Sequence, residues 1–199
     1  MCYINDTKDF KFTGFVGDGP EKLKLRLYVD ADFAGDRLDA KSTSGALLVL
    51  VGPNTYYPLQ WSSRKQTSVS RSTTESEVVS LAAGLYGDAL PMMSLFDLLL
   101  DKDCELEVLE DNQATITVIR KGYSSKLRHV SRTHKVNLAS LSEAIKADGV
   151  SLQYVESKKQ AADIFTKALS PGLWGAALKM LCVGKESIQS LYRFMCAAL

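Results

Sequence analysis

The chain has 199 residues, of which 46% are hydrophobic and 24% are charged. This composition is typical of a folded globular domain, and it excludes a disordered tail, a collagen and a coiled coil. The formal net charge is only +1. No overall field therefore attracts a polyanion, and a nucleic-acid surface would have to be a local patch.

The four cysteines form no CxxC pair and show no short regular spacing. This pattern argues against a zinc site and against a disulfide framework, and it favours a reducing, intracellular compartment. The N-terminus has no basic region followed by an apolar one, and no apolar run approaches the roughly 20 residues that span a bilayer. We therefore expect no membrane partner.

Three strands are expected first. Residues 23–32 alternate apolar and polar side chains, which predicts a strand that ends in acidic residues. After a polar turn, residues 46–51 (ALLVLV) predict a short buried strand. The turn sequence GPN then introduces a third strand at residues 56–63, which completes a meander.

Helices and two more strands follow. From about residue 73 to 100, Val78, Ala82, Leu85 and Ala89 repeat at helical spacing, and Pro91 should kink or split this helix. The remaining expected elements are a strand at 106–109, helices at 113–121 and 133–147, a strand at 150–156, a helix through 161–169 capped by Ser157 and Gln160, and one or two helices after residue 172. This order predicts a mixed α/β sheet with helices on both faces.

Four carboxylates fall at the ends of these elements: Asp30, Glu77, Asp111 and Asp163. If the first and fourth strands are neighbours, their acids share one edge of the sheet, and helix residues packed over that edge can complete a cluster. Crowded carboxylates repel one another unless cations neutralise them. A set of oxygen ligands favours magnesium or manganese over zinc.

Each acid also has a purely structural interpretation. Glu77 completes a T-x-x-E capping box, Asp111 could be an N-cap, and Asp163 would complement a helix dipole. Asp30 could mark a turn. Taken singly, the structural interpretation is favoured because short motifs have many false positives, so the order and context of the acids have to decide.

Four sequence blocks carry these acids in order: YVDADFAGDRLDAKSTSG, LQWSSRKQTSVSRSTTESEVVSLAA, LEDNQATI and VESKKQAADIFTKAL. With them, residues 3–169 resemble the ribonuclease H domain of a Copia-type LTR retrotransposon polyprotein. The segment MCYINDTKDFKF resembles the end of the reverse transcriptase connection that precedes this domain. The resemblance divides the chain into a lead-in (residues 1–20), a ribonuclease H domain (21–170) and a C-terminal helical extension (171–199).

The resemblance implies an RNase H-like fold, with a five-stranded mixed sheet whose second strand is antiparallel. It implies endonucleolytic hydrolysis of the RNA strand of an RNA/DNA hybrid, which leaves a 3′-hydroxyl and a 5′-phosphate. The implied cofactors are two magnesium ions, which manganese can replace. By resemblance, Asp30, Glu77, Asp111 and Asp163 are catalytic metal ligands: Asp30 bridges both ions, Asp163 holds the ion that activates water, and the other two hold the ion at the leaving oxygen.

Substrate contacts should sense the geometry of the hybrid and the 2′-hydroxyl rather than base sequence. Thr73, Thr74, Asn112 and Gln113 occupy positions that resemble minor-groove contacts of the family. Residues 112–142 hold six basic and no acidic side chains, which favours a phosphate-binding patch over a solvated face. The candidate phosphate contacts are Arg64, Lys65, Arg71, Lys126, Arg128 and Arg132.

The implied partners are the RNA/DNA hybrid and an adjacent reverse transcriptase domain, and the implied location is a cytoplasmic retrotransposon particle. Other functions fit less well. YVDAD resembles the YxDD polymerase signature, but Ala31 separates the two aspartates. An integrase or transposase would place its glutamate last. The alternative from another class is a non-catalytic hybrid-binding module from a decayed or domesticated element, although all four carboxylates are present.

The sequence departs from the family in one loop. Many ribonucleases H carry a histidine between the last strand and the last catalytic helix, where it assists product departure, whereas this loop reads ESKKQAA. The two histidines, His129 and His134, lie upstream in the basic segment. They could form local hydrogen bonds or contact phosphate, and the local role is favoured.

Overall fold

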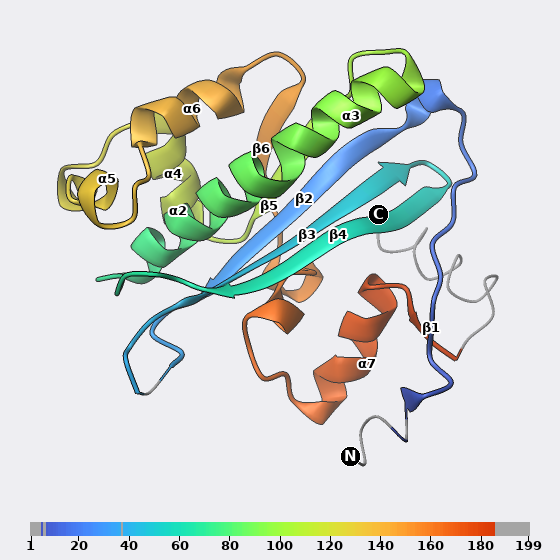
Figure 1. Ribbon diagram of the computed structural model, residues 1–199, viewed down its shortest axis with the longest axis horizontal. Coiled ribbons are helices and arrows are strands. Elements are labelled where there is room, and N and C mark those ends of the chain that lie inside the picture. The colour runs from blue at the N-terminus through green and yellow to red at the C-terminus, as the bar shows by residue number, and fades with distance from the viewer. Residues whose placement is uncertain (1–4, 6, 37, 186–199) are drawn as a thin grey trace.

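The computed structural model describes residues 5, 7–36 and 38–185 and has a central five-stranded sheet (Figure 1). The strands of this sheet are β2 (Lys24–Asp32), β3 (Thr43–Gly52), β4 (Thr55–Lys65), β5 (Leu106–Glu110) and β6 (Val150–Tyr154). The helices are α2 (Thr73–Gly84), α3 (Leu90–Leu100), α4 (Gln113–Lys121), α5 (Val130–Thr133), α6 (Leu138–Lys146) and α7 (Pro171–Met180).

The strand order in the sheet is β4-β3-β2-β5-β6. Strand β3 pairs antiparallel with β2 and with β4, whereas β5 runs parallel to both β2 and β6. The predicted mixed sheet with an antiparallel second strand is therefore confirmed. The bounds of β2 agree with the strand expected at residues 23–32, but Asp30, expected at the end of that strand, lies two residues before it.

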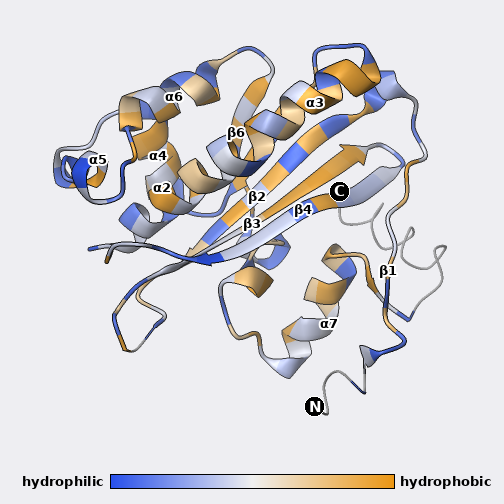
Figure 2. Ribbon diagram, in the orientation of Figure 1, coloured by the Kyte–Doolittle hydropathy of each residue, from blue (hydrophilic) through white to orange (hydrophobic). Residues whose placement is uncertain are grey.

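Both faces of the central strands are covered. On one face, α2, α3, α4 and α6 pack on the sheet, and Leu25, Leu27 and Val29 of β2 belong to the larger core on this side. On the other face, Tyr28 and Leu47 pack in a smaller core that the segment leading into α7 and the residues after α7 help to cover. This arrangement explains the nearly continuous apolar run of β3, because a strand buried on both sides has no solvent face (Figure 2).

The long helical segment is split into three parts. Helix α2 ends at Gly84, a π-helical turn covers Leu85–Ala89, and α3 follows with Pro91 in its first turn. Proline lacks the N–H that a continuous helix needs, and the wider π turn absorbs this interruption. The four apolar residues that predicted the helix, Val78, Ala82, Leu85 and Ala89, are all buried.

By length and composition alone, the stretch Thr73–Leu100 could cross a membrane, since its mean hydropathy reaches 1.3. In this fold, however, Val78, Leu81 and Leu85 pack in the core next to β2 and β3. A core helix passes the same test of length and hydropathy, so the stretch is weak evidence for a membrane span.

Two expected helices differ in the structure. The segment 133–147 does not form one helix, because α5 ends at Thr133, Lys135 adopts a left-handed φ of 62°, and α6 begins only at Leu138. Asn137 caps α6 by accepting hydrogen bonds from the backbone N–H groups of Ala139 and Ser140. A capped start of this kind separates the two helices.

The segment after β6 also lacks the expected α-helix. It contains two 3₁₀ turns, Ser157–Lys159 and Asp163–Phe165. Gln160 is 1% exposed and does not complete a capping box. Its side-chain N–H group instead donates to the carbonyl of Val29 (2.9 Å). This bond ties the segment to β2 at Gln160, where the expected helix would have begun.

The lead-in and the C-terminal region meet beside the sheet. The two-residue strands β1 (Lys11–Phe12) and β7 (Val183–Gly184) pair antiparallel, and Phe15 forms a bridge with Tyr56 of β4. Helix α7 begins as expected, while any second helix would fall in residues 186–199, outside the described residues. The division into lead-in, ribonuclease H domain and extension remains a prediction.

Candidate functional site

The parallel register of β2 and β5 brings two of the four acids together. Tyr28 lies opposite Leu109, the last registered pair between these strands. Two residues further along each chain, the same register places Asp30 beside Asp111. The first and fourth expected strands are therefore neighbours, as the proximity of their acids required.

Helix α2 brings Glu77 over the same edge. Ser80, one turn after Glu77, donates its hydroxyl to the carbonyl of Asp30 at 2.6 Å. One turn further, Gly84 lets the helix approach the sheet closely, since a Cβ there would lie 3.0 Å from Val29 Cγ1. Glu77, Ser80 and Gly84 thus share the face of α2 that packs on β2.

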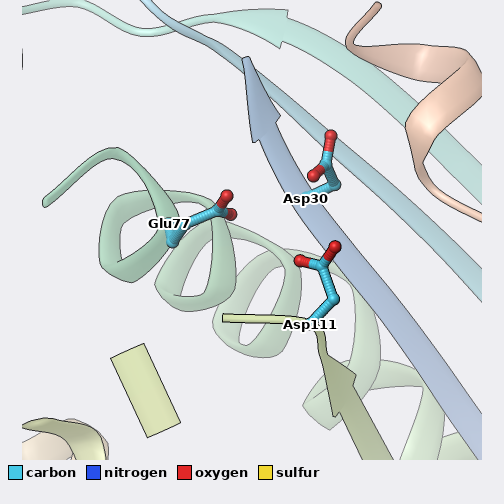
Figure 3. A group of neighbouring side chains, drawn as sticks. All are labelled: Asp30, Glu77 and Asp111. Carbon is cyan, nitrogen blue, oxygen red and sulfur yellow. The ribbon is translucent and has the colours of Figure 1, made fainter. Parts of the chain in front are cut away.

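Three carboxylates converge in this way. Asp30, Glu77 and Asp111 each offer an oxygen atom within 4.8 Å of the others, and Figure 3 shows their carboxylates pointing toward one another from β2, α2 and the end of β5. Asp30 is 1% exposed and Glu77 is 3% exposed. The geometry is that of a candidate cation site with oxygen ligands.

The capping roles considered for Glu77 and Asp111 are filled by neighbouring residues instead. Ser72 caps α2, and Glu75 accepts a hydrogen bond from Arg71 N–H at this end of the helix. Asn112 rather than Asp111 caps α4. Because neither acid serves as a cap, both are available to the cluster, and Asp111 accepts a hydrogen bond from the Ser157 hydroxyl at 2.7 Å.

Asp163 lies apart from this group of three and is linked to it through a lysine. The Nζ atom of Lys167 lies 3.1 Å from Asp30 Oδ1 and 3.0 Å from Asp163 Oδ1. The turn that carries Asp163 sits on Gly45 of β3, where a Cβ would lie 2.6 Å from Thr166 Cγ2 and 3.0 Å from the carbonyl oxygen of Ala162. A glycine at this position is what lets the fourth acid reach the end of β2.

Sequence reasoning missed Glu110. Its side chain is fully buried, Oε1 accepts a hydrogen bond from Asn112 N–H at 3.0 Å, and Oε2 has no partner among the described residues. The alternation in LEVLE could have revealed it, because Glu110 falls on the same face of the strand as Val108. Lys167 was also missed, although it follows Asp163 by one helical turn in the same sequence block.

The residues fit a divalent cation. Glu77 Oε2 and Glu110 Oε2 are both buried without a hydrogen-bond partner in the described structure. Buried polar atoms normally have partners, and an ion held by Asp30, Glu77 and Asp111 would supply one for Glu77 Oε2. The set of donors contains only oxygen, which suits magnesium or manganese better than zinc.

An open cleft of about 730 Å³ lies in front of these acids. Three of the predicted substrate contacts line it, namely Thr73, Asn112 and Gln113, together with Phe33 and Lys167. Thr74, the fourth predicted contact, is half-buried on α2 and does not line the cleft.

Comparisons with known proteins agree with this geometry. No protein-family model matches the chain. Over 153 residues, 74% of the chain, it is 30% identical to the retrovirus-related Pol polyprotein from transposon RE1 of Arabidopsis thaliana. Over 149 residues, 73% of the chain, it is 28% identical to the corresponding polyprotein from transposon TNT 1-94 of Nicotiana tabacum. The matched segment spans only 10% of each polyprotein.

Among solved structures, LC11-RNase H1, isolated from compost by a metagenomic approach, matches with a TM-score of 0.50 and 18% identity, over 72% of this chain and 92% of that one. LC11-RNase H1 in complex with an RNA/DNA hybrid gives a TM-score of 0.49 and 19% identity, over 72% and 94% of the two chains. The chain is a homologue of transposon Pol polyproteins and has the ribonuclease H fold. Its assignment to the Copia type remains a prediction.

The predicted phosphate contacts of this RNase H-like domain fall in two places. Those at the end of β4 are already engaged: Arg64 lies 3.7 Å from Asp88, and Lys65 pairs with Asp36 and Asp39 at 2.5 and 2.9 Å. Arg71 is exposed just before α2. These carboxylates neutralise part of the charge that Arg64 and Lys65 could offer to a phosphate.

The other three contacts lie in the basic segment, residues 120–135. Lys126 and Arg132 are exposed, and Arg128 lies over the ring of Tyr123, 5.8 Å from its centroid, while it donates to the tyrosine hydroxyl. The stacking holds the Arg128 guanidinium at the surface. These three cations are therefore presented to solvent.

Both histidines attach this basic segment to α2. Glu75 is 1% exposed, and its carboxylate lies 3.0 Å from His129 Nε2 and 3.2 Å from His134 Nε2. Only the His129 contact has hydrogen-bond geometry, since His134 Nε2 lacks a hydrogen-bond partner. The expected local role is therefore more specific than predicted: the contacts place the basic segment beside the helix turn that carries Glu77.

Repulsion and burial raise the pKa values of several carboxyl groups at the site. Burial raises the pKa of Glu77 to about 10, and repulsion from Glu110 and Asp30 acts in the same direction. Burial also holds the pKa of Glu110 well above its usual range. Burial raises the pKa of Asp163, although a hydrogen bond from Lys167 opposes the shift.

Burial alone would lower the pKa of Lys167, but the Asp30 carboxylate and the hydrogen bond with Asp163 outweigh it and raise the pKa above its usual value. The lysine is therefore charged across the neutral pH range.

Replacing Glu75 with alanine should destabilise the fold. His129 and the backbone N–H of Arg71 would lose their buried hydrogen-bond acceptor, and His134 would lose the nearby carboxylate, so we expect the free energy of unfolding to fall by about 3 kcal/mol in urea titrations. Glu143→Ala on the exposed side of α6 is the matched control and should change little. Equal effects of the two substitutions would show that Glu75 does not hold the basic segment in place.

Metal-free protein should lose stability as the pH rises. A carboxyl group with a raised pKa keeps a proton in the folded state that the unfolded chain has released, so the free energy of unfolding falls between the usual glutamate pKa of about 4.5 and the folded value of about 10 for Glu77. The slope is about 1.4 kcal/mol per pH unit for each retained proton. Lys167 does not oppose this trend, because its raised pKa keeps its contribution constant until the pH exceeds about 10.5.

Thermal melting in EDTA across this pH range tests the effect. Glu77→Gln should show a shallower decrease than the unaltered protein, and added Mn²⁺ should flatten the profile because an ion neutralises the carboxylates. Parallel profiles for the two proteins in EDTA would contradict the shifted pKa of Glu77.

Proposed function

We propose that this domain is a metal-dependent ribonuclease H that cleaves the RNA strand of RNA/DNA hybrids and leaves a 3′-hydroxyl and a 5′-phosphate. The observation that carries the proposal is the convergence of Asp30, Glu77 and Asp111, with Asp163 close by, at one edge of a sheet with the ribonuclease H fold. The homology to transposon Pol polyproteins supports the same activity.

The carboxylates would hold two magnesium ions, which manganese can replace. Asp30 is suited to contact both ions because it is central, lying near Glu77 and Asp111 on one side and linked to Asp163 on the other. Bound ions would activate a water molecule and stabilise the leaving 3′-oxygen. The protein contributes fixed positions: each acid projects from a strand, a helix or a turn that is anchored to β2.

The cleft favours a duplex backbone over a small ligand. It is open and polar, and it is flanked by the side chains of Thr73, Asn112 and Gln113. Short hydroxyl and amide groups suit contacts with sugar hydroxyls, which distinguish RNA from DNA without reading bases. Lys126, Arg128 and Arg132 would add sequence-independent contacts with phosphates.

The parent protein is proposed from the comparisons. Because the chain aligns with about a tenth of the Pol polyproteins, we propose an adjacent reverse transcriptase domain as its partner, in cytoplasmic retrotransposon particles. A non-catalytic hybrid-binding module remains the alternative, and the first experiment below separates the two.

Asp30→Asn should abolish cleavage of a labelled RNA/DNA hybrid in Mg²⁺ or Mn²⁺, because the central carboxylate is lost. Hybrid binding, measured by fluorescence anisotropy, should persist or improve because repulsion of the phosphates decreases. Asp148→Asn, at an exposed position before β6, is the matched control and should cleave normally. Unaltered protein that binds the hybrid but leaves it intact in both metals would favour the non-catalytic module.

The basic segment should contribute to binding through charge alone. Replacing Lys126, Arg128 and Arg132 with alanine should weaken binding of every hybrid sequence alike. It should also lower the slope of log affinity against log salt by about 0.9 for each phosphate contact that is lost. Lys146→Ala, an exposed lysine at the end of α6, serves as a control. An unchanged salt slope in the triple variant would assign these three residues to an ordinary solvated surface.

A further inference from the structure

Lys167 and its neighbour occupy both carboxylate oxygens of Asp30. Lys167 Nζ lies 3.1 Å from Asp30 Oδ1 and 3.0 Å from Asp163 Oδ1. Thr166 donates its hydroxyl to Asp30 Oδ2. The central acid of the cluster is therefore bonded at both oxygens to one short segment, which also carries the fourth acid.

The backbone directs the ammonium group to this position. Lys167 N–H donates to the carbonyl of Asp163 at 3.0 Å, so the two side chains emerge one turn apart. The segment cannot shift easily, because it packs closely on Gly45 and is tied to β2 by Gln160. Asp163 and Lys167 consequently reach the end of β2 together.

The contact differs from an ordinary surface ion pair. Exposed ion pairs contribute little because water screens both charges. Here the side chain of Asp30 is 1% exposed, whereas that of Lys167 is 40% exposed. A buried carboxylate attracts a nearby cation strongly, while the exposed, flexible lysine stem leaves a route by which the ammonium group can swing out to solvent.

Among the described residues that line the cleft, Lys167 is the basic one. It faces Asp30, Glu77 and Asp111 in that lining, and the same Asp30 belongs to the group of three that could hold a cation. A divalent cation and the lysine ammonium therefore seek the same carboxylate.

We propose that Lys167 is an internal counter-ion that competes with divalent cations for Asp30 and Asp163. The inference rests on the proposed function in that it requires the site to bind metal. In the metal-free protein, the ammonium group neutralises part of the carboxylate charge and holds the two acids in place. A cation that takes up Asp30 displaces it, so Lys167 sets the ion concentration at which the site fills.

Metal binding without nucleic acid tests the competition. Lys167→Met removes the charge but keeps most of the side-chain length, and we expect Mn²⁺ to bind about tenfold more tightly in isothermal titration calorimetry. Lys167→Arg keeps the charge and should stay near the original affinity. Lys159→Met, which removes an exposed lysine in the preceding turn, is the matched control and should leave Mn²⁺ affinity unchanged.

Thermal melting separates a counter-ion from a residue that only packs. In EDTA, Lys167→Met should melt at a lower temperature than the unaltered protein, because its carboxylates repel one another without compensation. Saturating Mn²⁺ should close this gap, since the ion then neutralises the acids in both proteins. A gap that persists in Mn²⁺ would overturn the proposal.

The outcomes distinguish failure of the counter-ion proposal from failure of the proposed nuclease function. Equal or weaker Mn²⁺ binding by Lys167→Met would overturn the counter-ion and leave the proposed nuclease intact, whereas no binding by the unaltered protein would overturn both. If Lys167→Met does not fold in EDTA, refolding in Mn²⁺ should restore its circular dichroism spectrum. Failure of Mn²⁺ to restore it would also count against the counter-ion.

Discussion

Mutual repulsion among carboxylates is the constraint that this fold has to satisfy. Asp30, Glu77 and Glu110 are all buried at one end of β2, where a low dielectric strengthens the interaction between charges. Repulsion among the acids opposes the assembly of such a cluster, and Lys167 offsets part of it through its ion pairs with Asp30 and Asp163. The rest of the free energy that holds the acids together has to come from the packing of the elements that carry them.

Three anchors to the sheet provide that support. Parallel pairing fixes β5 against β2, the Ser80 hydroxyl ties α2 to the backbone of Asp30, and Gln160 ties the last segment to Val29. Each anchor uses a hydrogen bond to backbone or a strand ladder rather than a contact between the acids themselves. The backbone positions of the acids therefore do not rest on contacts between the acids, which suits a site that gains and loses cations.

The sequence predicted the sheet because its strands have simple patterns. Alternation in residues 23–32 and the apolar run of β3 reflect one-sided and two-sided burial, and these are local properties of the chain. The order of the acids was equally readable, since it follows directly from the four sequence blocks that carry them. The sequence did not predict features that depend on contacts between residues far apart in the chain.

Three of those features shape the site. Residues 161–169 have a helical pattern, but the contact with Gly45 and the bond from Gln160 hold them in a 3₁₀ turn. The break between α5 and α6 depends on a left-handed Lys135. The contact of Glu75 with His129 joins residues 54 positions apart, and no spacing rule links them.

Gly45 also makes assembly of the site depend on the correct register between β2 and β3. If β3 slid along its partner, a residue with a side chain would lie under the Asp163 turn at nearly every alternative alignment, since Gly52 is the other glycine within that strand after Gly45. The turn would then be pushed off the sheet, and the acid it carries would be lost from the cluster. A molecule with this misalignment could not bring its four acids together, so assembly of the site requires the correct register between β2 and β3.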